Sequence, residues 1–310
     1  MTGITGTPAS NAAIAGARTA RGAAQAKINL RLRVLSRESS GYHQIETAFQ
    51  RLDLADEVTV RTNVSGRAVE CTGDVVPDGG LGPAEQNLAY RAALAYREAA
   101  GWPDGFAIEI VKRIPVGGGL GGGSADAGTV LRILEALAPR PMGVRVLELA
   151  ARLGADVPFM TTEAPLAFAW GRGERMLGLT PLPRRRVQLV VPAFGIGTAE
   201  AYCWLSDSRS PYELTGALLP AAALQSWPEV ADVAENDFEG PVEQRHPEIA
   251  RYRKALERAG ARIAMLAGSG STVFGVFEDG GRGAVAADLD GARLIETRTA
   301  AHVVPIRMIE

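Results

Sequence analysis

A run of glycines at residues 117–123 is the part of the sequence best suited to chemistry. Six of these seven residues are glycine, with Leu120 as the exception, and Ser124 follows them. Glycine lacks a Cβ, so its backbone can adopt positive φ angles and lie directly against a ligand. An apolar helical pattern starts at Ser124, a favourable N-cap residue, so free backbone N–H groups and the positive end of a helix dipole meet here. This combination predicts a site for an anion, with phosphate as the expected one.

Four polar residues outside the run are candidates for work at that phosphate. Lys27 and Asn29 lie two residues apart in the alternating stretch 24–35, so they share one face of a predicted strand. Asp156 stands at a break in the helical pattern, two residues before Pro158. These three also have structural interpretations: the solvated face of an edge strand for Lys27 and Asn29, and a turn or N-cap for Asp156. Lys112 precedes the glycines and is either a nucleotide contact or a surface charge.

Several common phosphate and nucleotide motifs do not fit the run. It formally contains G-x-G-x-x-G, but the strand before it alternates and no acid follows at about 20 residues, which disfavours a dinucleotide-binding oxidoreductase. No lysine stands in the G-x-x-x-x-G-K-[ST] spacing, and the H-R-D and D-F-G motifs of protein kinases do not occur. The G-x-S-x-G motif of serine hydrolases does not occur either.

Apolar periodicity places short alternating strands before helices in both halves of the chain. The predicted strands span residues 24–35, 45–54, 57–61, 106–114, 166–170, 187–191, 262–266, 272–277 and 303–308, with a turn at 53–56. The predicted helices span residues 87–100, 124–138, 143–153, 198–206, 247–260 and 284–289. This order favours an α+β fold with mostly antiparallel sheets over a doubly wound parallel sheet.

The chain divides by composition into a tail and two lobes. Residues 1–22 are rich in Gly, Ala, Thr and Ser without a period, so we expect a disordered tail there. Residues 181–186 are rich in proline and arginine and form the predicted lobe boundary. We therefore expect an N-terminal domain at residues 23–183, which holds the glycine run, and a C-terminal domain at residues 184–310.

Charge and cysteine content exclude several classes of partner and site. The formal net charge is −2 over 310 residues, so neither nucleic acid nor an anionic membrane surface is expected as a partner. No apolar run reaches the roughly 18 residues of a membrane span. The only cysteines, Cys71 and Cys203, lie far apart, which is typical of the reducing cytoplasm rather than of a disulfide framework or zinc site. We expect a cytoplasmic protein, as a monomer or weak homodimer.

Five stretches together resemble the GHMP kinases, the small-molecule kinases named for galactose, homoserine, mevalonate and phosphomevalonate. Residues 115–128 resemble the phosphate-binding motif of that family. The form of this motif and four further stretches resemble the branch that phosphorylates the 2-hydroxyl of 4-diphosphocytidyl-2-C-methyl-D-erythritol in the non-mevalonate isoprenoid pathway. These four stretches follow in the order of that branch, at residues 26–30, 41–43, 154–158 and 268–271.

The resemblance implies a two-lobed kinase fold, ATP as co-substrate, Mg²⁺ and a small-molecule acceptor. It implies that Asp156 is the general base and that Lys27 is the cation beside it. Ser124 would lie near Mg²⁺. The residues implied in ATP binding are Lys112, Pro115, Val116, Gly117, Gly118, Gly119, Leu120, Gly121, Gly122, Gly123, Ser124 and Ala125.

For the acceptor, the resemblance implies a site for a cytosine base. The ring of Tyr42 would stack on the base, and the imidazole of His43 would bond its edge; such stacking contributes ~1–3 kcal/mol per base. Tyr202 would be the ring on the other face, or equally a core tyrosine of its helix. Asn29 would hold the diol of the substrate.

Two alternatives stay open. The chain could be another GHMP kinase with a different small alcohol, but Tyr42 and His43 favour a cytidylyl substrate. It could also be a catalytically silent nucleotide-binding protein, which the presence of both Lys27 and Asp156 disfavours.

Overall fold

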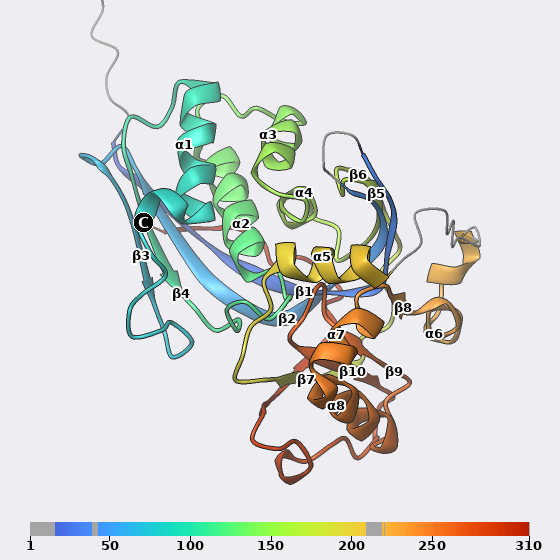
Figure 1. Ribbon diagram of the computed structural model, residues 1–310. Helices are drawn as coiled ribbons and strands as arrows, with labels where there is room; N and C mark the ends of the chain where they lie inside the picture. The colour runs from blue at the N-terminus through green and yellow to red at the C-terminus, as the bar shows by residue number, and fades with distance from the viewer. Residues whose placement is uncertain (1–15, 39–42, 209–218, 220, 310) are drawn as a thin grey trace, which may run out of the picture.

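The computed structural model describes residues 16–38, 43–208, 219 and 221–309. In this part of the chain the first sheet has the strand order β12-β1-β2-β4-β3, with β5 and β6 extending from β2 and β8 pairing with β1 (Figure 1). Its strands are β1 (Arg18–Arg37), β2 (His43–Thr62), β3 (Arg67–Thr72), β4 (Phe106–Val111), β5 (Leu166–Gly171), β6 (Arg175–Gly178), β8 (Glu235–Asn236) and β12 (Arg307–Ile309).

A second, smaller sheet lies in the C-terminal half. Its order is β11-β7-β10-β9, and all its pairs are antiparallel. Its strands are β7 (Arg186–Val191), β9 (Ile263–Leu266), β10 (Val273–Phe277) and β11 (Arg293–Arg298). In the first sheet only β1–β8 and β3–β4 pair in parallel. The prediction of an α+β fold with mostly antiparallel sheets is therefore confirmed.

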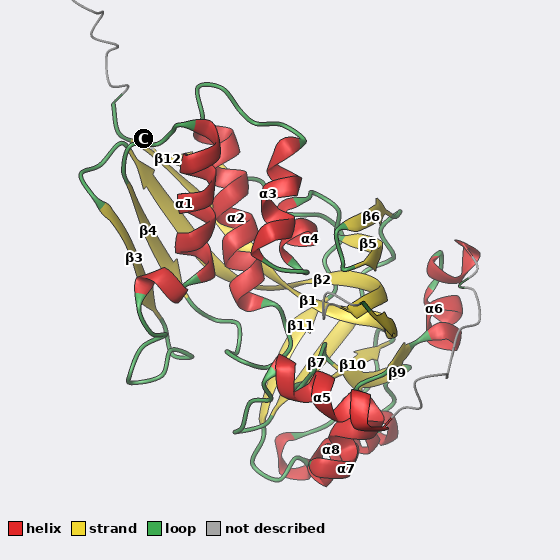
Figure 2. Cartoon of the chain, turned by 45° about the horizontal axis from the view of Figure 1, so that its top comes forward, coloured by secondary structure: helices red, strands yellow, loops and turns green. Residues whose placement is uncertain are grey.

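The helices form separate layers on the two sheets (Figure 2). Four of them, α1 (Leu88–Ala100), α2 (Gly122–Leu137), α3 (Arg145–Leu153) and α4 (Val157–Thr161), cover one face of the first sheet. The later ones are α5 (Thr198–Ser208), α6 (Trp227–Val233), α7 (Glu239–Arg245) and α8 (Pro247–Arg258), and α8 packs on β9 and β10. Among the described helices, none combines the length and apolarity needed to cross a bilayer.

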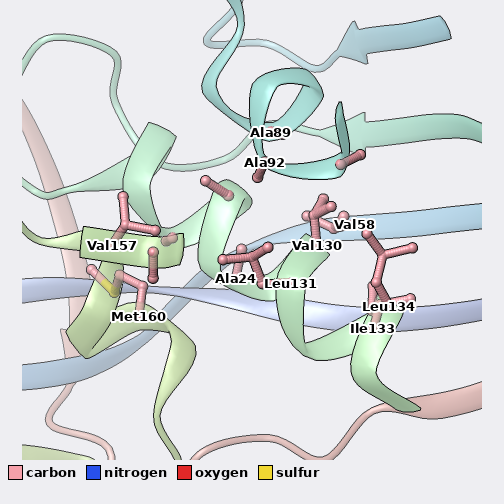
Figure 3. Close-up of a cluster of buried hydrophobic side chains, with 14 of the residues drawn as sticks. Ala24, Val58, Ala89, Ala92, Val130, Leu131, Ile133, Leu134, Val157 and Met160 are labelled. Carbon is pink, nitrogen blue, oxygen red and sulfur yellow. The ribbon is translucent and has the colours of Figure 1, made fainter. Parts of the chain in front are cut away.

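Helix α2 is the centre of the larger core (Figure 3). Val130, Leu131 and Leu134 are fully buried because α2 lies between α1 and the first sheet. Burying each such side chain contributes ~1.5–3 kcal/mol. The glycine run directly precedes this helix, so the loop is attached at one end to a buried element of the core.

Two local predictions in the N-terminal half differ from the structure. Strand β1 begins at Arg18, so the tail prediction is wrong for residues 18–22; residues 1–15 lie outside the described part. Position 22 requires glycine because α2 packs closely there: a Cβ on Gly22 would lie 2.7 Å from a methyl carbon of Thr129. Strand β2 is continuous across residues 53–56, where a turn was predicted. The buried Asp56 carboxylate accepts from the backbone N–H groups of Arg113 and Ile114 instead of closing a turn.

Smaller differences concern the C-terminal half. Residues 284–289 contain only a 3₁₀ turn at Ala286–Asp288, and the last strand is confined to Arg307–Ile309. In this half β8, β11, α6 and α7 were not predicted, and in the N-terminal half β6 and α4 were not. The second sheet begins with β7 at Arg186, but the chain returns to the first sheet at β8 and again at β12. The domain boundary at 183/184 stays a prediction.

Candidate active site

A cavity of about 620 Å³ lies between the two halves of the molecule. The first half contributes the glycine run, Lys27 and Asn29 from β1, and Asp156 from the start of α4. The second half contributes Tyr202 from α5 and the glycine turn at residues 268–270. Most of the residues predicted for the site are thus in one cavity.

The glycine run connects β4 to α2. Gly121 has φ 72° and takes the N-cap position, so α2 begins at Gly122 rather than at Ser124. The N-cap prediction for Ser124 is therefore wrong by three residues, because the left-handed conformation at residue 121 requires glycine. Ser124 is half-buried in the first turn of α2 and lines the cavity.

The two glycine segments of the cavity contact each other through their backbones. Gly119 has φ 77°, and a Cβ on it would lie 1.9 Å from the Ala267 carbonyl oxygen. A Cβ on Gly268 would lie 2.9 Å from the Gly119 carbonyl oxygen. Gly123 differs, because a Cβ there would meet no protein atom within 4 Å. Packing therefore explains the first two glycines, whereas Gly123 is exposed and has open space at its Cβ position.

Lys27 connects Asp156 to this loop. Its Nζ donates to the Asn29 Oδ1 at 2.9 Å and to the Gly119 carbonyl oxygen at 3.0 Å. It also lies 3.3 Å from the Asp156 Oδ2. Lys27 is 3% exposed and sits on an interior strand, so the solvated edge-strand interpretation does not hold.

The backbone of β1 is irregular on both sides of this pair. The pairing of β1 with β2 shifts register between Gln25 and Lys27 and again between Asn29 and Arg31. Such bulges change where side chains point, and they occur often beside active sites. The Lys27 N–H also bonds the Leu120 carbonyl oxygen at 3.0 Å, which ties the strand to the glycine run.

Asp156 has its carboxylate directed toward Lys27. It occupies the N-cap position of α4, yet its side chain makes no capping hydrogen bond to that helix. Its side chain is 28% exposed, so one side is open to the cavity while the other faces Lys27. The N-cap interpretation thus describes the backbone position but not the use of the carboxylate.

Lys112 is buried in a charged cluster rather than on the surface. Its Nζ pairs with Asp126 at 2.6 Å and with Asp56. The second Asp126 oxygen, Oδ1, is buried without a hydrogen-bond partner in the described chain. Burial raises the pKa of Asp126 to about 7, and the Asp56 charge adds to this while Lys112 opposes it. Burial acts to lower the pKa of Lys112, but Asp126 and Asp56 together raise it.

Aromatic rings form another wall of the cavity. The rings of His43 and Tyr202 are stacked with centroids 4.4 Å apart, and Tyr202 meets Phe238 edge-on at 4.9 Å. Tyr202 and Phe238 line the cavity. Burial, and secondarily the Asp156 charge, raises the pKa of Tyr202 to about 12. Tyr42 lies outside the described residues, so its predicted stacking remains a prediction.

Sequence reasoning missed the residues that support this site from behind. Asp56 holds the backbone before the glycine run through the N–H groups of Arg113 and Ile114. Asn236 donates to the carbonyl oxygens of Leu266 and Gly268, both at 2.8 Å, and so holds the second glycine turn. Both are buried polar residues whose partners are distant in sequence, so no local pattern identifies them.

Two family models match the chain in order. The N-terminal domain of the GHMP kinases matches residues 87–164, and the C-terminal domain matches residues 218–291. The first match includes the glycine run and Asp156, and the second includes the turn at 268–270.

Curated relatives match most of the chain. A protein of Geobacter sp. (strain M21) named 4-diphosphocytidyl-2-C-methyl-D-erythritol kinase is 40% identical over 258 residues, or 83% of this chain and 89% of that protein. A protein of Pelotomaculum thermopropionicum with the same name is 38% identical over 281 residues, or 89% of this chain and 92% of that protein.

Solved structures agree with these matches. A crystal structure of 4-(cytidine 5'-diphospho)-2C-methyl-D-erythritol kinase superposes with a TM-score of 0.72 at 36% identity, over 90% of this chain and 99% of that one. A homoserine kinase from Cytophaga hutchinsonii shares the fold at 15% identity, with a TM-score of 0.65 over 99% of this chain and 100% of that one. The chain therefore belongs to the GHMP kinase family, in its 4-diphosphocytidyl-2-C-methyl-D-erythritol kinase branch.

Proposed function

We propose that this protein transfers the γ-phosphoryl group of ATP to the 2-hydroxyl of 4-diphosphocytidyl-2-C-methyl-D-erythritol. One observation carries the proposal most directly. Lys27 contacts the Asp156 carboxylate and the Gly119 carbonyl oxygen at once, so a candidate base and a candidate phosphate loop meet at one cation. A phosphoryl transfer needs this juxtaposition of acceptor activation and phosphate binding.

In the reaction, Asp156 accepts the proton of the substrate hydroxyl. The hydroxyl oxygen forms a bond to the γ-phosphorus as the bond from that phosphorus to the β–γ bridging oxygen breaks, and ADP leaves with the electron pair. Lys27 lies beside Asp156 and stabilises negative charge that develops on the moving phosphoryl group. Asn29 orients the Lys27 ammonium through its Oδ1 while its own amide donates to the Thr47 hydroxyl at 2.8 Å.

ATP binding is assigned to the glycine run and the first turn of α2. The backbone N–H groups of residues 117–123 and the N-terminus of a 16-residue helix favour phosphate oxygens. The open space at Gly123 supports a ligand atom close to the backbone there. Lys112 is assigned to the nucleotide side of the cavity, where its ammonium group is paired with Asp56 and Asp126 and is not a free cation.

The residues present fit Mg²⁺ only as an ion that arrives with the nucleotide. No group of three or more His, Cys, Asp or Glu side chains in the described chain could hold a metal alone. Mg²⁺ bound to nucleotides takes most of its ligands from phosphates and water, with one or two from the protein. Ser124 lines the cavity at the loop and is the protein contact we assign to it. When bound, the ion neutralises phosphate charge.

The acceptor is assigned to the aromatic wall. Tyr202 lines the cavity and His43 stacks on it, which provides a flat surface and a hydrogen-bonding ring for a nucleobase. This wall supports a cytidylyl substrate over the small alcohols of the other GHMP kinases, which carry no base. Asn29 is also within the cavity lining, where we assign it to the diol.

The test is an ATP-dependent assay with four alcohols. We expect ADP formation with the cytidylyl substrate and none above background with mevalonate, homoserine or galactose, and ³¹P spectroscopy should place the new phosphate on the 2-hydroxyl. Faster turnover of one of the other alcohols would assign the protein to another activity of the family. ATP binding without turnover of any alcohol would indicate a silent nucleotide-binding protein.

A further inference from the structure

We propose that Arg51 is a positioning residue that sets the location of Asp156 by holding the opposite end of helix α4. The inference rests on the proposed role of Asp156 as general base. Neither the sequence pattern nor the family resemblance pointed to Arg51.

The first observation is what the guanidinium of Arg51 binds. Its Nη2 donates to the Phe159 carbonyl oxygen at 2.7 Å and to the Thr162 carbonyl oxygen at 3.0 Å. Its Nε donates to the Ala164 carbonyl oxygen at 3.2 Å. These carbonyls belong to the last turn of α4 and the residues that follow it. Carbonyl groups at a helix C-terminus favour a cation, so Arg51 stabilises the end of α4 that Asp156 does not occupy. The Phe159 carbonyl oxygen there also accepts from the N–H and hydroxyl of Thr162.

The second observation is the register of β1 and β2. Lys27 and Arg51 are cross-strand partners, so their side chains leave the same face of the sheet. That face is the one on which α4 lies. Lys27 contacts Asp156 at the start of α4, and Arg51 contacts the carbonyls at its end. A helix of five residues is thereby fixed at both ends by two neighbouring cations of one sheet.

The third observation is how α4 packs between these ends. The Phe159 ring stacks on Phe49 with centroids 4.8 Å apart, and the Arg51 guanidinium lies 4.7 Å from the Phe159 ring centroid. On the other side, Gly128 of α2 allows close approach, because a Cβ there would lie 2.5 Å from the Met160 carbonyl carbon. A helix confined this closely transmits a shift at one end to the other.

The fourth observation is that no acidic side chain among the described residues forms an ion pair with Arg51. Arg51 is 1% exposed, and no carboxylate of the described residues forms an ion pair with it. Burial, with a smaller contribution from Arg132, lowers the pKa of Arg51 to about 9. A buried cation is unfavourable unless its donors are satisfied. Its stabilising partners are the carbonyls at the end of α4, so Arg51 and that end of the helix depend on each other.

The decisive experiment compares Arg51→Met and Arg51→Lys with Arg132→Met as the matched control. Arg132 is also a buried arginine, but it donates to the Val304 carbonyl oxygen at 3.1 Å and pairs with Glu163 at 3.6 Å, without a hydrogen bond to α4. Each variant is titrated with ATP first, and kcat is then expressed per nucleotide-binding site. This removes any loss due to unfolded protein from the comparison.

We expect Arg51→Met to lower kcat per site by ~10²-fold, because small displacements of a catalytic group have effects of this size. The KM for ATP should change by less than about threefold, since the glycine run is untouched. Arg51→Lys should lose about tenfold, because one ammonium cannot reach all three carbonyls. Arg132→Met should keep kcat per site within about threefold of the parent even if it unfolds at lower temperature.

Two results would overturn the inference. One is an Arg51→Met protein whose kcat per site equals that of the parent, and the other is an equal loss in Arg51→Met and Arg132→Met. If Arg51→Met does not bind ATP at all, Arg51→Lys decides, and full kcat in that variant contradicts the proposal. Asp156→Asn separates the two hypotheses: if it is inactive while Arg51→Met is active, only the role of Arg51 is wrong. If Asp156→Asn keeps full kcat, the proposed base is wrong.

Discussion

On one side of the cavity, Lys27 is buried on an interior strand and has three polar partners, one of which is the backbone of the glycine run. On the other side, Tyr202 and His43 are half-buried and meet each other mainly through their ring faces. The first side is built from a sheet and backbone carbonyls, and the second from side chains at the end of a strand and on a helix. This difference suggests that the reaction depends on fixed geometry, while substrate choice depends on a surface that a few substitutions can change.

The largest effect is expected at the fixed side. Asp156→Asn removes the proposed base but keeps the size of the side chain, so kcat should fall by ~10²–10⁴-fold, the range for general base catalysis. ATP binding, measured by titration calorimetry, should stay close to that of the parent. A variant that retains full kcat would show that the carboxylate next to Lys27 is not the base.

A pair of glycine substitutions tests how much of the loop is fixed by the protein itself. In Gly119→Ala the new Cβ would meet the Ala267 carbonyl oxygen, and φ at this residue is 77°. We expect a loss of stability of about 1–3 kcal/mol from this strain, seen in urea unfolding. In Gly123→Ala no protein atom lies within 4 Å of the new Cβ, so stability should be unchanged while the KM for ATP rises. If Gly123→Ala has the same KM for ATP as the parent, Gly123 does not contact the nucleotide.

A smaller and more selective effect is expected on the aromatic side. His43→Ala deletes one ring of the stack with Tyr202. Loss of a hydrogen bond from the imidazole to the edge of the base, about 0.5–1.5 kcal/mol, corresponds to a rise in KM for the cytidylyl substrate of about 2–13-fold. The KM for ATP should not change, and steady-state kinetics with each substrate varied in turn measures both. Equal increases in the two KM values would place His43 away from the base.

The last effect concerns the pH dependence of stability rather than activity. The pKa of Asp126 is raised to about 7 in the folded state by burial, whereas in an unfolded chain it would be near its ordinary value of 3.8. Between these two values the folded state binds more protons at this residue, so its contribution to stability declines as pH rises toward 7 and is then constant. Asp126→Asn should remove this decline. Urea unfolding at pH 5 and pH 8 measures it, and equal pH dependence in both proteins would contradict the raised pKa.

Local sequence signals were enough for many of the elements and for part of the site. The alternation around Lys27 and Asn29 put both side chains on one face, and the glycine run before an apolar helical pattern located the loop, because both signals depend only on neighbouring residues. Asp156 is different: alone it fits an N-cap, and only the family pattern distinguished it. Its backbone does occupy the N-cap position, so the two interpretations are compatible.

The supporting residues could not be predicted from the sequence, because their partners are distant along the chain. Arg51 gains its role from its register with Lys27 and from carbonyls more than 100 residues away in sequence. Asp56 lies in a polar stretch that locally favours a turn, but tertiary hydrogen bonds to Arg113 and Ile114 keep that stretch extended. Long-range hydrogen bonds of this kind leave no period in the sequence.

The return of the last strand to the first sheet bears on how the molecule can be divided. Residues Arg307–Ile309 pair with residues 19–21 of β1, and the Gln25 side chain bonds the backbone of His302 and Val304. A cut at the predicted boundary would therefore separate β1 from one of its own neighbours. Two halves expressed apart would each expose an edge that the intact chain covers, so we expect them to regain activity only when mixed, as complementing fragments rather than as autonomous modules.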